Sequence, residues 1–180
     1  MKSIAVILSD GFEEIEAVSV IDILRRGTCH VEIFGLSGLT VTGAHDLTFD
    51  TDEIFEYYNT LKYDGVVLVG GMKNAINLSM NNDVLKLLEE YNNSHKLVAG
   101  ICATPAVVFS KTNILDGKNA TCYPDIDLKS MLNNYVDSDV VVSDNVITSQ
   151  SPSTAVKFAI EILKYLELDA DGVFKGLIGK

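Results

Sequence analysis

Cys102 is the residue of this chain whose type and position best suit nucleophilic chemistry. It follows the apolar run Leu97–Ile101 and comes before Ala103, Thr104 and Pro105, and proline favours the first turn of a helix. Cys102 is therefore expected on a sharp strand-to-helix turn, where a helix N-terminus stabilises a thiolate and lowers the thiol pKa. The alternative is a buried apolar cysteine, the usual state of a free thiol.

Glu16 is the second candidate for chemistry. It lies four residues after Phe12 and four before Val20, which places it on an apolar stripe if this segment is helical. A carboxylate on such a stripe must be protonated, paired or hydrogen-bonded, and burial raises its pKa. Glu16 is thus a candidate proton donor to a nearby thiolate, or a general base. The alternative is a carboxylate at the rim of the core that reaches water.

Gly70 and Gly71 follow the apolar run at residues 65–69. Two glycines at this point let the backbone approach a ligand and turn its N–H groups towards it. Together with the N–H of Ala103 they would form an oxyanion hole. The alternative is a tight turn. No Gly-x-Gly-x-x-Gly pattern occurs, so this is not a dinucleotide-binding fingerprint.

The remaining histidines and cysteines give weaker signals. His45 is the histidine expected near the ends of the strands, whereas His30 and His95 are expected on the surface. Cys29 and Cys122 are interpreted as structural thiols. The spacing of the cysteines is not typical of a metal site. The sequence therefore predicts chemistry without a metal or a cofactor.

Short apolar runs alternate with segments of helical periodicity along the chain. This pattern predicts an α/β fold in which a mostly parallel sheet has helices on both faces, and such sheets place their sites at the carboxyl ends of the strands. Strands are expected at residues 4–8, 31–36, 65–69, 97–101, 120–123, 136–142 and 146–148. Helices are expected at 13–26, 81–94, 105–110 and 153–166, with a small hairpin formed by 40–42 and 47–49.

Composition limits the classes of function. The 180 residues, 47% of them hydrophobic and 22% charged, suit a single domain spanning residues 1–180. The net charge of -11 disfavours nucleic acid as a partner. No apolar run reaches the ~18 residues of a membrane span, so no membrane association is expected. An odd number of cysteines, three, favours a reducing cytoplasm.

Three motifs taken in order resemble the ThiJ/PfpI superfamily, in particular its DJ-one-like branch. They are Glu13-Glu14-Ile15-Glu16, Gly70-Gly71 and the segment from Ala99 to Pro105. The resemblance covers nearly the whole chain and implies a flavodoxin-like α/β sandwich, usually a homodimer. It also implies that Cys102 is the cysteine of the family's nucleophile elbow, that Glu16 is the protonated glutamate bonded to it, and that Gly71 and Ala103 supply the facing amides.

The activities that the resemblance implies are diverse. They include glutathione-independent conversion of methylglyoxal to lactate, deglycation, chaperone action and peroxide sensing, and some relatives are peptidases. The chain departs from its relatives at three places around the expected pocket, which would also include Gly70. Tyr123 stands where they carry a histidine before proline, His45 where they carry a loop arginine, and Gln150 where they carry a later arginine. These changes argue against peptidase activity and imply a less cationic pocket.

The sequence thus predicts a cysteine-dependent enzyme that acts on small reactive aldehydes or glycated substrates. Such a glyoxalase- or deglycase-like lyase or hydrolase would use Cys102 and Glu16. The alternative is a protein without enzymatic activity, either a sensor of oxidative stress that works through oxidation of Cys102, in which Glu16 bonds the oxidised sulfur, or a chaperone-like dimer.

Overall fold

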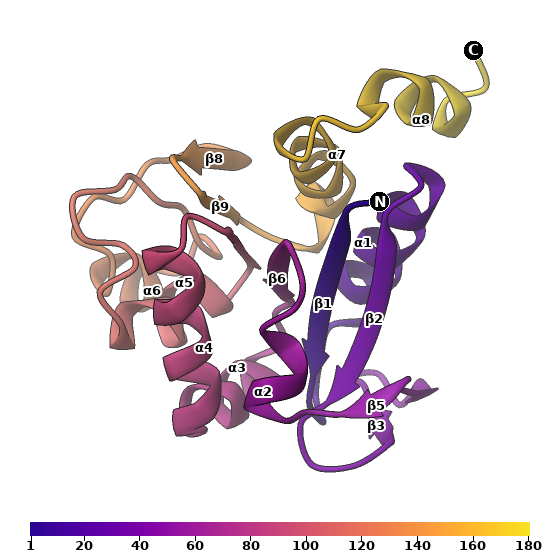
Figure 1. The fold of residues 1–180 in the computed structure, drawn as a ribbon. Coiled ribbons are helices and arrows are strands. Elements are labelled where there is room, and N and C mark those ends of the chain that lie inside the picture. The colour runs from indigo at the N-terminus through magenta and orange to yellow at the C-terminus, as the bar shows by residue number, and fades with distance from the viewer.

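A seven-stranded sheet forms the centre of the computed structural model, which describes residues 1–180 (Figure 1). Its spatial order is β5-β2-β1-β6-β7-β9-β8, and every neighbouring pair is parallel except β8 and β9. The mostly parallel sheet predicted from the apolar runs is therefore confirmed. The strands are β1 (Ser3–Leu8), β2 (His30–Gly35), β5 (Glu53–Ile54), β6 (Gly65–Leu68), β7 (Leu97–Ile101), β8 (Val140–Ser143) and β9 (Val146–Ser149).

Helices cover both faces of this sheet, as expected. On one face α1 (Glu14–Arg26) packs against α7 (Ala155–Tyr165). The other face carries α3 (Met72–Ser79), α4 (Asn82–Asn93) and α5 (Thr104–Val107). The short elements are α2 (Tyr57–Thr60), α6 (Ile126–Ser130), α8 (Ala170–Leu177), the 3₁₀ turns η1 (Phe109–Lys111) and η2 (Pro152–Thr154), and the hairpin β3 (Thr40–Thr42) and β4 (Thr48–Asp50).

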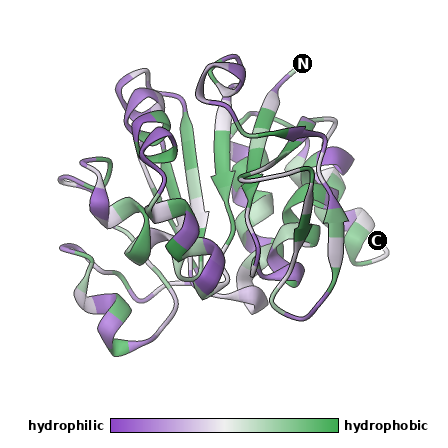
Figure 2. Ribbon diagram, turned by 90° about the horizontal axis from the view of Figure 1, so that it is seen from below, coloured by the Kyte–Doolittle hydropathy of each residue, from purple (hydrophilic) through white to green (hydrophobic).

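The alternation of side chains along β1 explains why the sheet needs two covering layers. Ile4, Val6 and Leu8 point into the core beneath α1 and α7, and Ala5 and Ile7 point into the opposite core. All five are fully buried, because successive side chains of a strand face opposite sides. The hydrophobic colouring of Figure 2 is accordingly concentrated on the central strands. None of the helices combines the length and apolar character that a membrane-crossing helix requires.

Two of the predicted strands are wrong or too long. Residues 120–123 form no strand, because Ala120 makes only an isolated bridge to Tyr135 and the N–H of Thr121 donates to the side chain of Thr148. Pro124, which has no N–H to donate, follows directly. The strand predicted at 136–142 begins only at Val140, because the preceding residues turn back on themselves through a bond from Ser138 N–H to Val136 O.

Several helices were missed or predicted with the wrong length from the sequence pattern. Helix α3 starts directly after Gly71, at residues for which no helix was predicted. Helix α8 contains Gly172 and Gly176, and glycine is a poor helix former. The helix expected at 105–110 is a single α-turn, α5, followed by the 3₁₀ turn η1.

The carboxyl ends of the parallel strands lie beside the β3–β4 hairpin. The N–H of Gly11 donates to Thr42 O (2.7 Å) and the N–H of Ala44 to Phe12 O (2.8 Å). These bonds fix the hairpin against the loop that leads into α1. Buried Asn74 joins the same region, since it accepts from Ser9 N–H (2.8 Å) and donates to Val69 O (2.8 Å). Hydrogen bonds therefore hold together the edge of the sheet where the candidate residues lie.

Candidate active site

Cys102 occupies the turn between β7 and α5, in a strained backbone conformation. Its φ is +64°, a left-handed value that residues with a side chain seldom adopt and that neighbouring structure must enforce. The enforcement is visible: Cys102 N–H donates to Ser149 O (3.0 Å), and Tyr123 N–H donates to Cys102 O (2.8 Å). The side chain of Cys102 is partly buried. The strand-to-helix turn expected from the sequence is therefore present.

Glu16 is fully buried on α1, and its carboxyl group faces the same turn. Its Oε2 accepts a hydrogen bond from Gly70 N–H (2.7 Å), whereas Oε1 has no partner of ordinary geometry. Burial is the main cause that raises the pKa of Glu16 to about 7; the Gly70 N–H and the side chain of Cys102 oppose this rise. A carboxyl group with this pKa is able to hold or release a proton near neutral pH.

Gly70 separates the two reactive side chains and has no room for a side chain of its own. A Cβ on Gly70 would lie 2.5 Å from Cys102 Cβ, 3.0 Å from Cys102 Sγ and 2.8 Å from Glu16 Oε2. Since real Cβ atoms do not approach other atoms so closely, glycine is required here. Gly70 is thus an N–H donor and a close-packing position at the centre of the site.

The pKa of the Cys102 thiol is raised, first by burial and then by the charge of Glu16. The N–H groups of Gly71 and Ala103 act on the sulfur in the opposite direction. The expectation of a lowered thiol pKa is therefore wrong. The helix that follows has only four residues and supplies little dipole to offset burial. Cys102 and Glu16 titrate as a coupled pair, and with the proton on Glu16 the two amides favour the thiolate.

Gly71 and Ala103 are held so that their amides face the sulfur. Gly71 has a φ of +84° and precedes α3, and a Cβ there would lie only 2.1 Å from Gly11 O. Ala103 begins the turn of α5 and is buried. Two N–H groups that converge on the sulfur stabilise negative charge there. Gly71 and Ala103 therefore lie beside the sulfur of Cys102, the position that the family resemblance implied.

The other two pocket candidates from the later part of the chain behave differently. Tyr123 is joined to Cys102 through the main chain, and its side chain is 44% exposed. The side chain of Gln150 donates to Asp137 Oδ1 (2.8 Å) and to the Tyr135 hydroxyl (3.3 Å). Gln150 is thus engaged with the loop before β8, and none of its hydrogen bonds reaches Cys102.

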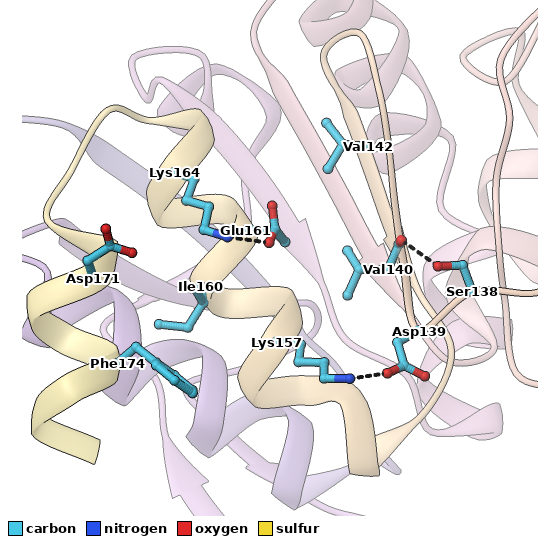
Figure 3. A pocket seen from close by; sticks show the side chains of 10 residues that line it. All are labelled: Ser138, Asp139, Val140, Val142, Lys157, Ile160, Glu161, Lys164, Asp171 and Phe174. Atoms are coloured by element: carbon cyan, nitrogen blue, oxygen red, sulfur yellow. Dashed lines mark hydrogen bonds and ion pairs between the residues drawn. The ribbon is translucent and has the colours of Figure 1, made fainter. Parts of the chain in front are cut away.

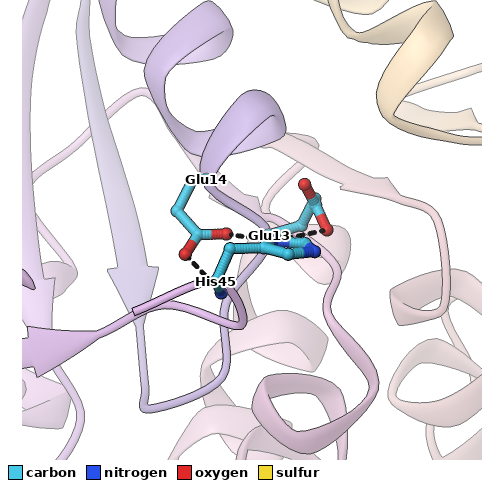
Figure 4. A group of neighbouring side chains, drawn as sticks. All are labelled: Glu13, Glu14 and His45. Atoms are coloured by element: carbon cyan, nitrogen blue, oxygen red, sulfur yellow. Dashed lines mark hydrogen bonds and ion pairs between the residues drawn. The ribbon is translucent and has the colours of Figure 1, made fainter. Parts of the chain in front are cut away.

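His45 lies in the loop between β3 and β4, against the start of α1 (Figure 4). Its ring Nδ1 is 2.9 Å from Glu14 Oε2 and 3.9 Å from Glu13 Oε2, and its backbone N–H donates to Glu14 Oε1 (2.6 Å). Glu14 is buried, and the hydrogen bonds from His45 lower its pKa against the effect of burial. The sequence pattern does not single out Glu14, because its partner His45 lies across a loop.

Glu13, Glu14 and His45 also offer ligand atoms within 4.8 Å of one another. The carboxylate of Glu14, however, already accepts from both nitrogen donors of His45 and from Leu47 N–H. Hydrogen bonding therefore accounts for this geometry, and we assign it no metal.

A groove of about 510 Å³ lies between β8, α7 and α8, and Cys102 is not among the residues that line it (Figure 3). Val140, Val142, Ile160 and Phe174 form its apolar lining, and an ion pair between Lys157 and Asp139 lies at its rim. The residues that line it include no cysteine or histidine, so this groove offers no thiol or imidazole for chemistry.

Comparison with known proteins agrees with this arrangement. The sequence profile of the DJ-1/PfpI family matches residues 2–165. Protein dj-1beta of Drosophila melanogaster is 36% identical over 183 residues, which cover 98% of this chain and 97% of that protein. The chain belongs to the DJ-1/PfpI family. Two Arabidopsis thaliana relatives, DJ-1 homologs B and A, are each 33% identical over 89% of the chain, which spans only 37% and 41% of their lengths.

Solved structures support the same conclusion for the fold. The oxidized form of Toxoplasma gondii DJ-1 superposes with a TM-score of 0.93 at 28% identity, covering 99% of this chain and 98% of that one. Drosophila melanogaster DJ-1beta gives a TM-score of 0.87 at 34% identity, with 98% and 97% covered. The flavodoxin-like fold and the ThiJ/PfpI resemblance inferred from the sequence are confirmed.

Proposed function

We propose that this protein is a cysteine-dependent enzyme that converts small α-oxoaldehydes to hydroxy acids, methylglyoxal to lactate in the simplest case, without glutathione. The observation that carries this proposal is the pairing of Cys102 with buried Glu16, beneath the amides of Gly71 and Ala103. A nucleophile, a proton carrier and an oxyanion-binding pair are the groups that addition of a thiol to an aldehyde requires.

In the first step the thiolate of Cys102 attacks the aldehyde carbon and forms a hemithioacetal. The oxygen that gains the electron pair receives N–H bonds from Gly71 and Ala103, and the proton of Glu16 neutralises it. Glu16 then takes the proton from the former aldehyde carbon while the ketone oxygen gains a proton, which gives an enediol. Glu16 returns its proton to the former ketone carbon as the hydroxyl group on the sulfur-bearing carbon loses its proton and becomes a carbonyl. The product of this transfer is a lactoyl thioester on Cys102, and water releases lactate from it.

The proposal is tested by measuring lactate formed from methylglyoxal in the absence of glutathione. We expect turnover by the native protein, none by Cys102→Ser, and a loss of at least about 10²-fold in Glu16→Gln, the usual contribution of a general acid–base group. Unchanged activity in Cys102→Ser would contradict the proposal. Glycated amines, the substrates of a deglycase, should be tested in the same variants, because the hemithioacetal chemistry also suits them.

A second candidate function is a redox sensor in which Cys102 is oxidised to a sulfinate. The partial exposure of Cys102, in contrast to buried Cys29 and Cys122, favours it, and the same two amides and the proton of Glu16 would bind the added oxygens. The test is intact mass and peptide mapping after mild peroxide. Selective oxidation of Cys102 supports the sensor. First oxidation of Cys29 or Cys122, which are buried and whose pKa values burial raises to about 11, would contradict it.

We further propose that the protein works as a homodimer in a reducing compartment such as the cytoplasm. Ile15 and Val18 of α1 and Leu47 of the adjacent hairpin loop are large apolar side chains exposed by 59%, 48% and 55%, and clustered apolar exposure favours a protein partner. A chaperone-like role would use such a surface as well. Light scattering of the native protein and of Val18→Glu tests the dimer, which the added charge should dissociate.

A further inference from the structure

Glu14 and His45 form a carboxylate–imidazole pair of the kind that fixes a histidine for proton transfer. The carboxylate of Glu14 is held in place because it is buried and accepts the backbone N–H of His45 at 2.6 Å. It then receives ring Nδ1 at 2.9 Å. A donor at Nδ1 leaves Nε2 of the neutral ring without a proton and free to accept one. The side chain of His45 is 71% exposed, so water reaches this ring.

Short contacts connect this pair to the site of Cys102. The hairpin loop that carries His45 is tied to the residue before Glu13 through Ala44 N–H and Phe12 O. Glu13 lies 3.9 Å from the ring of His45, its N–H donates to Gly70 O, and its charge acts on Glu16. Glu13 therefore lies between the ring of His45 and the Gly70 turn, which contacts Cys102.

The proposed reaction lacks a group for its last step. Hydrolysis of a thioester needs a base that takes a proton from an incoming water. Glu16 is 0% exposed and bonded to Gly70 N–H, so it faces the substrate from inside the protein. Tyr123, whose N–H donates to Cys102 O, carries a phenol and no imidazole.

We propose that His45, oriented by Glu14, is the general base that activates water for hydrolysis of the Cys102 thioester. This inference rests on the proposed function. Nε2 of His45 takes a proton from water, whose oxygen forms a bond to the thioester carbonyl carbon. The carbon–sulfur bond then breaks, the sulfur leaves with the electron pair, and the proton returns from His45 through solvent. The products are lactate and the free Cys102 enzyme, and no other reactant is consumed.

Three acidic groups face His45, namely Glu14, Glu13 and Asp46, and hydrogen bonding to Glu14 is the main cause that raises its pKa. The neutral form that acts as a base is therefore lost on acidification at a higher pH than for an ordinary histidine, whose pKa is about 6.5. Hydrolysis should slow below that point, while formation of the thioester depends on Cys102 and Glu16.

The experiment follows lactate release and, by intact mass, the lactoyl adduct on Cys102 in His45→Gln and His45→Ala. We expect lactate release to fall by about 10²-fold, the adduct to accumulate, and added imidazole to restore turnover in His45→Ala, since the position is open to solvent. Glu14→Gln, which alters the orientation of the ring, should accumulate the same adduct and shift the lower limb of the pH profile. His30→Gln is the matched control, because His30 is also paired with a glutamate, at 3.4 Å from Glu32.

The outcomes separate this inference from the function on which it rests. A native protein that forms no lactate and no adduct overturns both. Native turnover with undiminished release in both His45 variants overturns only the role of His45. Slow release without adduct or imidazole rescue also overturns it, because His45 would then act before the thioester forms. Circular dichroism confirms that each variant is folded before it is assayed.

Discussion

Replacing Glu16 by glutamine should remove a pH dependence from the stability of the protein. Burial raises the pKa of Glu16 from its ordinary 4.5 to about 7. Between these values the folded chain retains a proton that the unfolded chain has released. The folded state binds more protons, so its free energy of unfolding falls as the pH rises through this interval. The carboxyl group is most favourable to the fold below pH ~4.5 and least favourable above about 7.

The size of the effect follows from the same interval. Each unit of pKa is worth about 1.4 kcal/mol, so ionisation of Glu16 costs the folded state about 3 kcal/mol by pH 8. Because Glu16 is 0% exposed, screening by solvent does not reduce this figure. Glutamine keeps an oxygen for the Gly70 N–H and stays neutral. The stability of Glu16→Gln relative to the native protein should thus increase by about 2.5 kcal/mol between about pH 5 and about pH 8.

Urea unfolding of both proteins at about pH 5 and about pH 8 measures this difference. Comparing the variant with the native chain at each pH cancels the other titrating groups. Cys102→Ser, which keeps Glu16 buried, should retain most of the native pH dependence. A stability difference between Glu16→Gln and the native protein that is the same at both pH values would refute the reasoning, since Glu16 would then ionise equally in the folded and unfolded chains.

Further perturbations probe the packing and titration of the same site. Gly70→Ala should reduce lactate formation and lower stability by about 1–3 kcal/mol in urea, because the new methyl group would lie 2.5 Å from Cys102 Cβ; Gly38→Ala, with open space around it, is the control. Asn74→Leu should lower stability by about 1–3 kcal/mol, since buried Ser9 N–H loses its acceptor, whereas Val69 O and Gly70 O keep donors in Thr104 and Glu13; thermal unfolding tests this. Burial and the charge of Glu16 raise the pKa of Cys102, so the rate of its alkylation by iodoacetamide should stay low through about pH 7 and rise only above pH ~8.5, the pKa of an ordinary thiol; a rise through about pH 7 would contradict this reasoning.

Much of the sheet could be predicted because its central strands are continuous apolar runs. Buried parallel strands need no polar face, so Leu97–Ile101 and its neighbours stand out from the amphipathic helices between them. The segment at 120–123 has a comparable composition but makes its bonds to a loop and to a side chain. The composition of such a segment predicts that it is buried. Whether another strand lies beside it depends on the assembled fold.

The candidate site, like the sheet, could be predicted from the sequence only in part. Cys102 and Glu16 were identifiable because each breaks the pattern of its own element, a thiol at a turn and a carboxylate on an apolar stripe. Glu14 was not, because an acidic residue at the start of a helix is ordinary, and its burial depends on the loop that carries His45. The direction of the thiol pKa was also wrong, because burial and the charge of Glu16 outweigh a helix of one turn.

The strained turn at Cys102 has a consequence for the order in which this protein matures during synthesis. Its N–H is held by Ser149 and its carbonyl by Tyr123, both of which are made later than Cys102. Chains emerge from the ribosome N-terminus first, so a nascent chain already displays Cys102 and Glu16 before the residues that enforce the turn exist. Until residue 149 has emerged, we expect Cys102 to react as an unstructured thiol. During this interval the thiol of the nascent chain is least protected against non-specific modification.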